Sequence, residues 1–167
     1  MDKNKNKIKI KVRKEVVLCS ECGNKKELNY LSDFAYGEQL ILIKGGTEYA
    51  YVNLLEDEVY KEVNTLLSQI LQENNILFSK SQFADCISNI FGITFDKIDN
   101  EEIDTSIEDE KCSICGSEEF EPNLIEPEQI IDIEVPVITH ILWKELSDVE
   151  KVKILKKELI KNKYIQI

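Results

Sequence analysis

The pentapeptide Cys19-Ser20-Glu21-Cys22-Gly23 recurs, with one substitution, as Cys112-Ser113-Ile114-Cys115-Gly116. A C-x-x-C turn directs two sulfurs toward one point, and the glycine after it relieves the steric cost of a tight turn. Two such turns supply four thiolates, the tetrahedral ligand set of a structural Zn²⁺ site. Soft sulfur ligands favour zinc or iron over magnesium or calcium. The pair therefore predicts a structural Zn²⁺ site, with iron as the alternative metal, whose ligands are Cys19, Cys22, Cys112 and Cys115.

The two turns resemble the paired knuckles of zinc ribbons and rubredoxin-like sites, in which C-x-x-C-G turns face each other. Residues 16–27 and 109–120 carry this resemblance, which implies a structural metal but no particular activity. Zinc-ribbon sequences usually separate their turns by far fewer than the 89 residues (23 through 111) found here. A fainter similarity links the paired turns to zinc-binding modules of some bacterial antitoxins, although no helix-turn-helix follows them in this chain. Four lysines flank the turns and are expected to compensate the charge of a tetrathiolate site: Lys14, Lys25, Lys26 and Lys111.

Alternating apolar residues predict two strands near the cysteine turns. Residues 7–18 alternate with period two at their start and run directly into Cys19, so they form a strand with one buried face. Residues 129–139 alternate in the same way, and Pro136 restricts that strand to an edge or a bulge. Pairing of the two strands can place acids opposite lysines: Asp132 and Glu134 facing Lys9 and Lys11.

The segment between the turns contains a hairpin and two helices in our prediction. Residues 39–52 form the hairpin, which turns at Lys44-Gly45-Gly46. Apolar residues at three- and four-residue spacing predict a helix that begins at a box formed by Asn53 and Glu56 and extends through residue 71. A second helix is predicted over residues 80–91, and the acidic residues 96–111 are predicted to form a loop or edge segment.

This order of elements predicts an α+β fold. At 167 residues the chain is expected to form a single domain, residues 1–167. In it a zinc ribbon, residues 7–27 and 109–139, is split by an insertion, residues 28–108. A C-terminal helix over residues 147–162 begins with a Ser147/Glu150 capping box. Apolar runs stay well below the 18 or so residues that cross a bilayer, and the N-terminus lacks an apolar signal region, so we expect no membrane association and a cytoplasmic location.

Charge is distributed unevenly along the chain. Residues 1–18 carry +5, residues 96–134 carry −13, and residues 140–167 carry +3, within a formal net charge of −11. The negative total argues against general nucleic-acid affinity. The charged segments either neutralise one another within the fold or leave an acidic surface for a basic partner.

Residues that support catalysis do not form a recognisable set. The only histidine, His140, lacks an accompanying nucleophile motif and is predicted to be an ordinary hydrogen-bonded or surface residue. Six glycines without a phosphate-binding pattern exclude P-loops and dinucleotide loops. Cys86 has helical spacing to its apolar neighbours, which predicts a core position. Four carboxylates resemble a calcium loop but lack its glycine and closing glutamate, so we predict a solvated loop: Asp96, Asp99, Glu101 and Asp104.

We therefore expect a non-enzymatic, zinc-stabilised acidic protein that binds a protein with a basic surface, as an immunity protein, antitoxin or inhibitor does. A thiol redox enzyme is a further alternative, although neither C-x-x-C turn opens an apolar helical pattern. The main alternative is a nucleic-acid-associated zinc-ribbon protein that uses basic residues near both ends of the chain: Lys3, Lys5, Lys7, Lys9, Lys11 and Arg13 with Lys153, Lys156 and Lys157.

Overall fold

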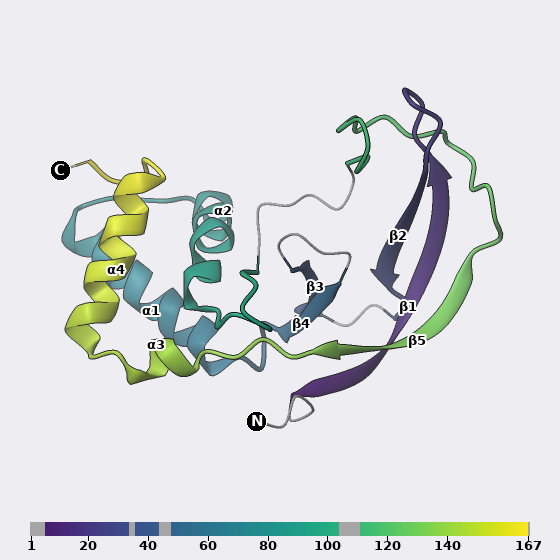
Figure 1. Ribbon diagram of the computed structural model, residues 1–167. Coiled ribbons are helices and arrows are strands. Elements are labelled where there is room, and N and C mark those ends of the chain that lie inside the picture. Colours follow the sequence, from purple (N-terminus) through teal and green to yellow (C-terminus); the bar gives the residue numbers. More distant parts are fainter. Residues whose placement is uncertain (1–5, 34–35, 44–47, 104–110, 167) are drawn as a thin grey trace.

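The computed structural model describes residues 6–33, 36–43, 48–103 and 111–166 (Figure 1). Antiparallel sheets combine with helices, which confirms the predicted α+β class. Within the described ranges, no helix is both long enough and apolar enough to cross a membrane. The elements in chain order are β1 (Lys7–Leu18), β2 (Lys25–Leu31), β3 (Glu38–Leu42), β4 (Tyr49–Asn53), α1 (Glu58–Glu73), α2 (Lys80–Ile90), the 3₁₀ turn η1 (Phe91–Thr94), β5 (Gln129–Pro136), α3 (Ile141–Glu145) and α4 (Asp148–Lys161).

Strand β1 lies at the centre of a three-stranded sheet with the order β2-β1-β5, and it is antiparallel to both neighbours. Strand β1 pairs with β5, the arrangement that would place acids opposite lysines, and the register sets Lys9 opposite Glu134 and Lys11 opposite Asp132. Lys11 Nζ lies 3.1 Å from the Asp132 carboxylate, and Lys9 Nζ lies 3.9 Å from it, so one carboxylate serves both lysines. These pairs are exposed, so each contributes about 1 kcal/mol at most.

Two elements, β2 and α3, were not predicted from the sequence. Strand β2 has only a weak apolar alternation, and it forms because the first cysteine turn reverses the chain and returns it along β1. Helix α3 is a short element of five residues. Its first N–H groups are held by Asp96, whose carboxylate accepts hydrogen bonds from Ile141 N at 2.6 Å and from Leu142 N at 3.0 Å. Asp96 therefore does not belong to a solvated loop, as the sequence suggested, but caps a helix that begins 45 residues later.

Helix α1 begins later than predicted. Its N-cap is Asp57, whose side chain accepts a hydrogen bond from Tyr60 N at 2.9 Å. Asn53, the predicted cap, instead accepts from Leu55 N at 3.2 Å in the turn that follows β4. Both residue types cap helices well, so local spacing alone could not choose between the two successive turns.

The remaining helices and the hairpin follow the prediction closely. Strands β3 and β4 pair as the expected antiparallel hairpin, whereas the predicted turn at Lys44-Gly45-Gly46 lies outside the described residues. Helix α2 starts at a Ser79/Gln82 capping box, and η1 continues from its end. Helix α4 starts at the predicted Ser147/Glu150 box.

The hydrophobic core has a helical part and a sheet part, which the β3–β4 hairpin connects. Helices α1, α2 and α4 enclose the largest cluster, which includes Cys86 as predicted. On one side of the hairpin, Tyr49 and Tyr51 pack against Val135 of β5. Its other buried residues, Ala50 and Val52, pack in a separate cluster with Ile138. The cysteine turn between β1 and β2 lies at the end of the sheet that is remote from the helices (Figure 1).

Candidate metal centre

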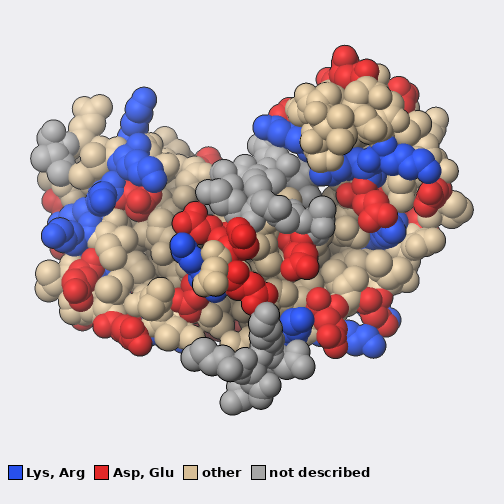
Figure 2. All heavy atoms as spheres, viewed as in Figure 1, with Lys and Arg blue, Asp and Glu red and all other residues tan. Residues whose placement is uncertain are grey.

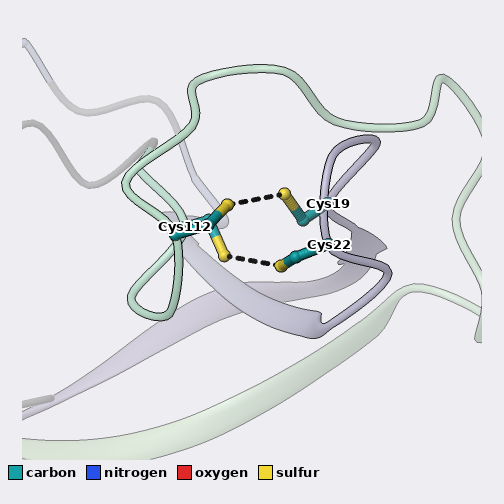
Figure 3. A group of neighbouring side chains, drawn as sticks. Cys19, Cys22 and Cys112 are labelled. Carbon is teal, nitrogen blue, oxygen red and sulfur yellow. Dashed lines mark hydrogen bonds between the residues drawn. The ribbon is translucent and has the colours of Figure 1, made fainter.

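The four predicted ligands meet at that end of the sheet. Figure 3 shows Cys19 and Cys22 from the first turn opposite Cys112 from the second. All four Sγ atoms lie within 4.8 Å of one another. The hydrogen-bonded sulfur pairs join different turns: Cys19 Sγ lies 3.5 Å from Cys115 Sγ, and Cys22 Sγ lies 3.5 Å from Cys112 Sγ. In a tetrahedral site with Zn–S bonds of about 2.3 Å, the sulfurs are about 3.8 Å apart. The four cysteines are thus positioned so that they could hold one metal ion.

The two turns are copies of one backbone conformation. In each, the N–H of the first cysteine donates to the carbonyl five residues later, at 2.9 Å in the first turn and 2.8 Å in the second. The glycine N–H donates back to the carbonyl of that cysteine, at 2.9 and 2.8 Å. Gly23 and Gly116 have φ values of 71° and 75°, a region that side chains disfavour. The shared C-S-x-C-G pattern therefore reflects a shared turn geometry.

The second turn is held against the first by backbone pairing along the end of β1. Ser20 N donates to Glu119 O at 2.9 Å, and Glu121 N donates to Leu18 O at 2.8 Å. Further along, Ile125 N donates to Val16 O at 3.0 Å. The chain thus leaves the second turn beside β1 and continues on that side into β5. The β1–β5 pairing brings the two cysteine turns together although they are far apart in sequence.

Hydrogen bonds to sulfur favour ionised thiols at this site. The Asn24 side-chain amide, 3.1 Å from Cys22 Sγ, and the Asn24 backbone N–H lower the pKa of Cys22 to about 6. Backbone N–H groups of Cys115 and Ile114 lower the pKa of Cys112. The Ser117 N–H also favours the Cys115 thiolate, but the neighbouring sulfurs outweigh it and raise the pKa of Cys115 to about 12. Crowded sulfurs resist full ionisation unless a cation lies between them, so metal binding would release protons.

Three of the four lysines that flank the turns form ion pairs with glutamates. Lys14 pairs with Glu27 at 2.8 Å. The other two pairs are Lys25 with Glu126 at 3.6 Å and Lys111 with Glu118 at 3.2 Å. These carboxylates reduce the positive charge that the lysines contribute to the sulfur cluster. N–H groups directed at sulfur, which the sequence analysis did not anticipate, also favour the thiolates.

His140 is buried, and both of its ring nitrogens have partners. Nε2 lies 2.8 Å from Asp57 Oδ2, while Nδ1 lies 2.9 Å from Thr94 Oγ1 and 3.0 Å from the Thr94 carbonyl. Thr94 is only 2% exposed, so its hydroxyl does not face a substrate. The three residues join the start of α1, the turn η1 and the start of α3. This is the ordinary hydrogen-bonded histidine that the sequence suggested.

The basic residues proposed for nucleic-acid binding do not come together. Strand β1 lies in the sheet half of the molecule and α4 in the helical half (Figure 1). Figure 2 accordingly shows Lys and Arg side chains in separate groups on the two halves. Lys9, Lys11 and Arg13 also lie beside carboxylates of Asp132, Glu15 and Glu128. Lys3 and Lys5 lie outside the described residues, as does Asp104 of the four carboxylates that resemble a calcium loop.

Asn24 is the site residue that the sequence analysis missed. A polar residue two positions after the second cysteine is the one signal that could have pointed to it, since its amide reaches back to Cys22. Comparison with known proteins adds no relative, because no family model, curated protein or solved structure matches the chain. The function is therefore inferred from the geometry described above.

Proposed function

We propose that this chain is a non-enzymatic binding protein whose two cysteine turns are joined by a structural Zn²⁺ ion. The observation that carries the proposal is the crosswise arrangement of the sulfurs, with contacts of 3.5 Å between turns. A redox C-x-x-C motif joins its own two sulfurs in a disulfide and sits at the start of a helix. Here the first turn leads into β2, and the four sulfurs surround one point, as a closed structural site requires.

The proposed partner is a protein with a basic surface, as for an immunity protein, antitoxin or inhibitor. Several acids of residues 96–134 already pair with lysines or Arg13, which supports partial neutralisation within the fold. The exposed carboxylates of Glu48, Asp99 and Glu134 line one cleft of 730 Å³ beside the hairpin. Its lining also contains Glu27 and three lysines, Lys7, Lys14 and Lys97. Glu101 is exposed at the same turn as Asp99. Figure 2 shows Asp and Glu side chains gathered in the middle of this face.

Carboxylates also lie near Tyr51 of the hairpin. Burial, the hydrogen bond to Glu38 and the charges of Glu38 and Glu56 raise the pKa of Tyr51 far above its ordinary value of 10.0. These carboxylates would raise the association rate and the selectivity for a partner that presents lysine or arginine to this surface. The acidic surface that we propose for binding comprises Glu48, Asp99, Glu101 and Glu134.

Two measurements test the proposal. Metal analysis of the purified protein should give one zinc per chain, and a protein that is folded without metal would exclude the structural site. For the partner, immobilised protein is exposed to lysate at low salt and at 0.5 M salt. Basic proteins should be retained at low salt and released at high salt. The binding hypothesis is wrong if no basic protein is recovered at low salt.

A charge-matched pair of variants separates the proposed surface from general acidity. Asp99→Asn with Glu101→Gln should abolish retention of the basic partner. Asp85→Asn with Glu145→Gln removes the same charge from exposed positions on α2 and α3 and should leave retention unchanged. Equal loss in both double variants would show that only the net charge matters.

A further inference from the structure

The two cysteine turns differ in how their second sulfur is held. In the first turn, Cys22 Sγ receives hydrogen bonds from both the backbone N–H and the side-chain amide of Asn24. The equivalent position in the second turn is Ser117, whose backbone N–H bonds Cys115 Sγ. The Ser117 hydroxyl accepts a hydrogen bond from Glu119 N at 3.0 Å, so it is engaged by the backbone of its own loop. The two turns therefore share one backbone conformation but differ at one side chain: Asn24 donates to the cysteine sulfur, whereas Ser117 accepts from the backbone.

This difference falls on the two cysteines that a reagent can reach. Cys22 and Cys115 are exposed, whereas Cys19 and Cys112 are buried. The fifth cysteine, Cys86, is 0% exposed within the helical core. A small molecule in solution therefore meets two of the five cysteines. Among the described residues, Cys22 receives a hydrogen bond from a side-chain amide and Cys115 does not.

Hydrogen bonds to a metal-bound thiolate draw electron density from sulfur and lower its basicity. The nucleophilicity of a thiolate falls as its basicity falls, with a Brønsted coefficient of about 0.4–0.5. A tenfold difference in basicity therefore changes the rate of attack on an electrophile by about threefold. Donors around metal ligands are known to tune a site in this way. The sulfur with fewer donors is the more reactive one.

We propose that Cys115 is the modification site of this metal centre: it is the ligand that reacts first with soft, uncharged electrophiles of the α,β-unsaturated carbonyl class. Asn24 is a positioning residue whose amide hydrogen bond makes Cys22 less reactive. The inference rests on the proposed Zn²⁺ site. The Cys115 sulfur adds to the β-carbon of the alkene, an S–C bond forms as the C=C π bond opens, and the α-carbon takes a proton from water. No leaving group or oxidant is needed. The thioether is a weaker ligand than the thiolate, so the metal loses its fourth ligand and becomes exchangeable.

N-ethylmaleimide tests the proposal on the full chain in its zinc-loaded form. Zinc content is measured first, then the reagent is added below stoichiometry, and the modified peptides are identified by mass spectrometry. A chromogenic chelator follows zinc release in parallel. We expect Cys115 to be modified faster than Cys22, by about threefold for each tenfold difference in basicity between the two sulfurs, with zinc released in step and with Cys86 unmodified. Modification of Cys22 at an equal or greater rate would overturn the inference.

Asn24 and Ser117 occupy equivalent positions in the two turns, so exchanging their residue types provides matched variants. Asn24→Ser gives the first turn the residue that the second turn already accommodates, and it should make the two exposed cysteines react at similar rates. Ser117→Asn should supply the missing donor, slow the modification of Cys115 and delay zinc release. A preference for Cys115 that neither variant changes would overturn the role of Asn24. A starting sample without metal would instead refute the proposed Zn²⁺ site, and the zinc measurement separates that result from the others.

Discussion

Replacing Cys112 by serine should release the metal and loosen one end of the sheet while the helical core stays folded. Cys112 is buried, it accepts two backbone hydrogen bonds, and its sulfur lies 3.5 Å from that of Cys22. Serine keeps the size of the side chain but is a poor zinc ligand at neutral pH. Without the metal, the second turn retains only its backbone contacts with β1, such as Ser20 N to Glu119 O and Glu121 N to Leu18 O.

The size of the effect follows from linkage between metal binding and folding. Structural zinc sites bind with about 10–16 kcal/mol, and about 12 kcal/mol corresponds to a dissociation constant near 1 nM. At about 1 μM free zinc, the ion then stabilises the native state by about 4.1 kcal/mol. For a chain of this length, each kcal/mol moves Tm by about 2–4 °C. The variant should therefore melt about 8–16 °C below the wild type.

Thermal unfolding monitored by circular dichroism, with about 1 μM free zinc or with a chelator, measures this difference. The variant in zinc should match the wild type in chelator. A glutamate-specific protease should cut the variant after Glu118 or Glu119, because net backbone hydrogen bonds of about 0.5–1.5 kcal/mol each hold that segment weakly. Cys86→Ala is the control, since Cys86 is buried outside the site and its replacement should leave the response to zinc intact.

The reasoning is refuted if Cys112→Ser keeps one zinc per chain with a wild-type Tm, or if its Tm falls while the protease cuts the helical core as readily as the second turn. The first result would show that three sulfurs suffice. The second would show that the metal site and the helical core unfold as one unit.

Four further substitutions have expected outcomes. Gly116→Ala should cost about 1–2 kcal/mol in thermal unfolding and keep its zinc, because φ is 75° there and an added Cβ would meet nothing within 4 Å. Asp57→Ala should lower the urea unfolding free energy at pH 7 by about 2–4 kcal/mol, because α1 loses its cap and His140 Nε2 loses its partner. Burial opposes the Asp57 carboxylate, but hydrogen bonds from His140 and Tyr60 N prevail and lower its pKa below 3.8. Its stabilising contribution is therefore present above pH 3.8 and is lost as the pH falls through the lowered value, so the cost of Asp57→Asn should shrink in acid. Leu67→Ala should cost about 2–5 kcal/mol in urea unfolding, since Leu67 is fully buried.

The strands and the long helices were predictable because their signals are local. Alternation in β1 and β5 indicated the buried faces, and complementary charges showed that the two strands could pair with acids opposite lysines. The antiparallel register, with Lys11 opposite Asp132, came from the structure. The Ser147 box identified the start of α4 for the same reason, since a cap and its partner are three residues apart. Where two residues suited to capping followed one another, as before α1, local rules did not distinguish Asn53 from Asp57.

Long-range hydrogen bonds explain what was missed. Asp96 caps α3 from 45 residues away, so its carboxylate looked like part of a solvated acidic loop. The partners of His140 were not predicted either, because Asp57 is 83 residues away in sequence and Thr94 is 46 residues away. In the metal centre, Asn24 looked like any polar turn residue until its amide was found beside the Cys22 sulfur.

The amino-acid sequence by itself determined the ligand chemistry of the candidate metal site, because the ligand type, the turn spacing and the following glycine are all contained within each five-residue turn. It also determined which strand faces are buried, because side chains alternate along a strand. Only the tertiary structure decided that the two turns meet, since β1 and β5 must first pair across most of the chain. The same pairing left Cys22 and Cys115 exposed and gave one of them an amide donor, a difference that depends on how side chains lie in space.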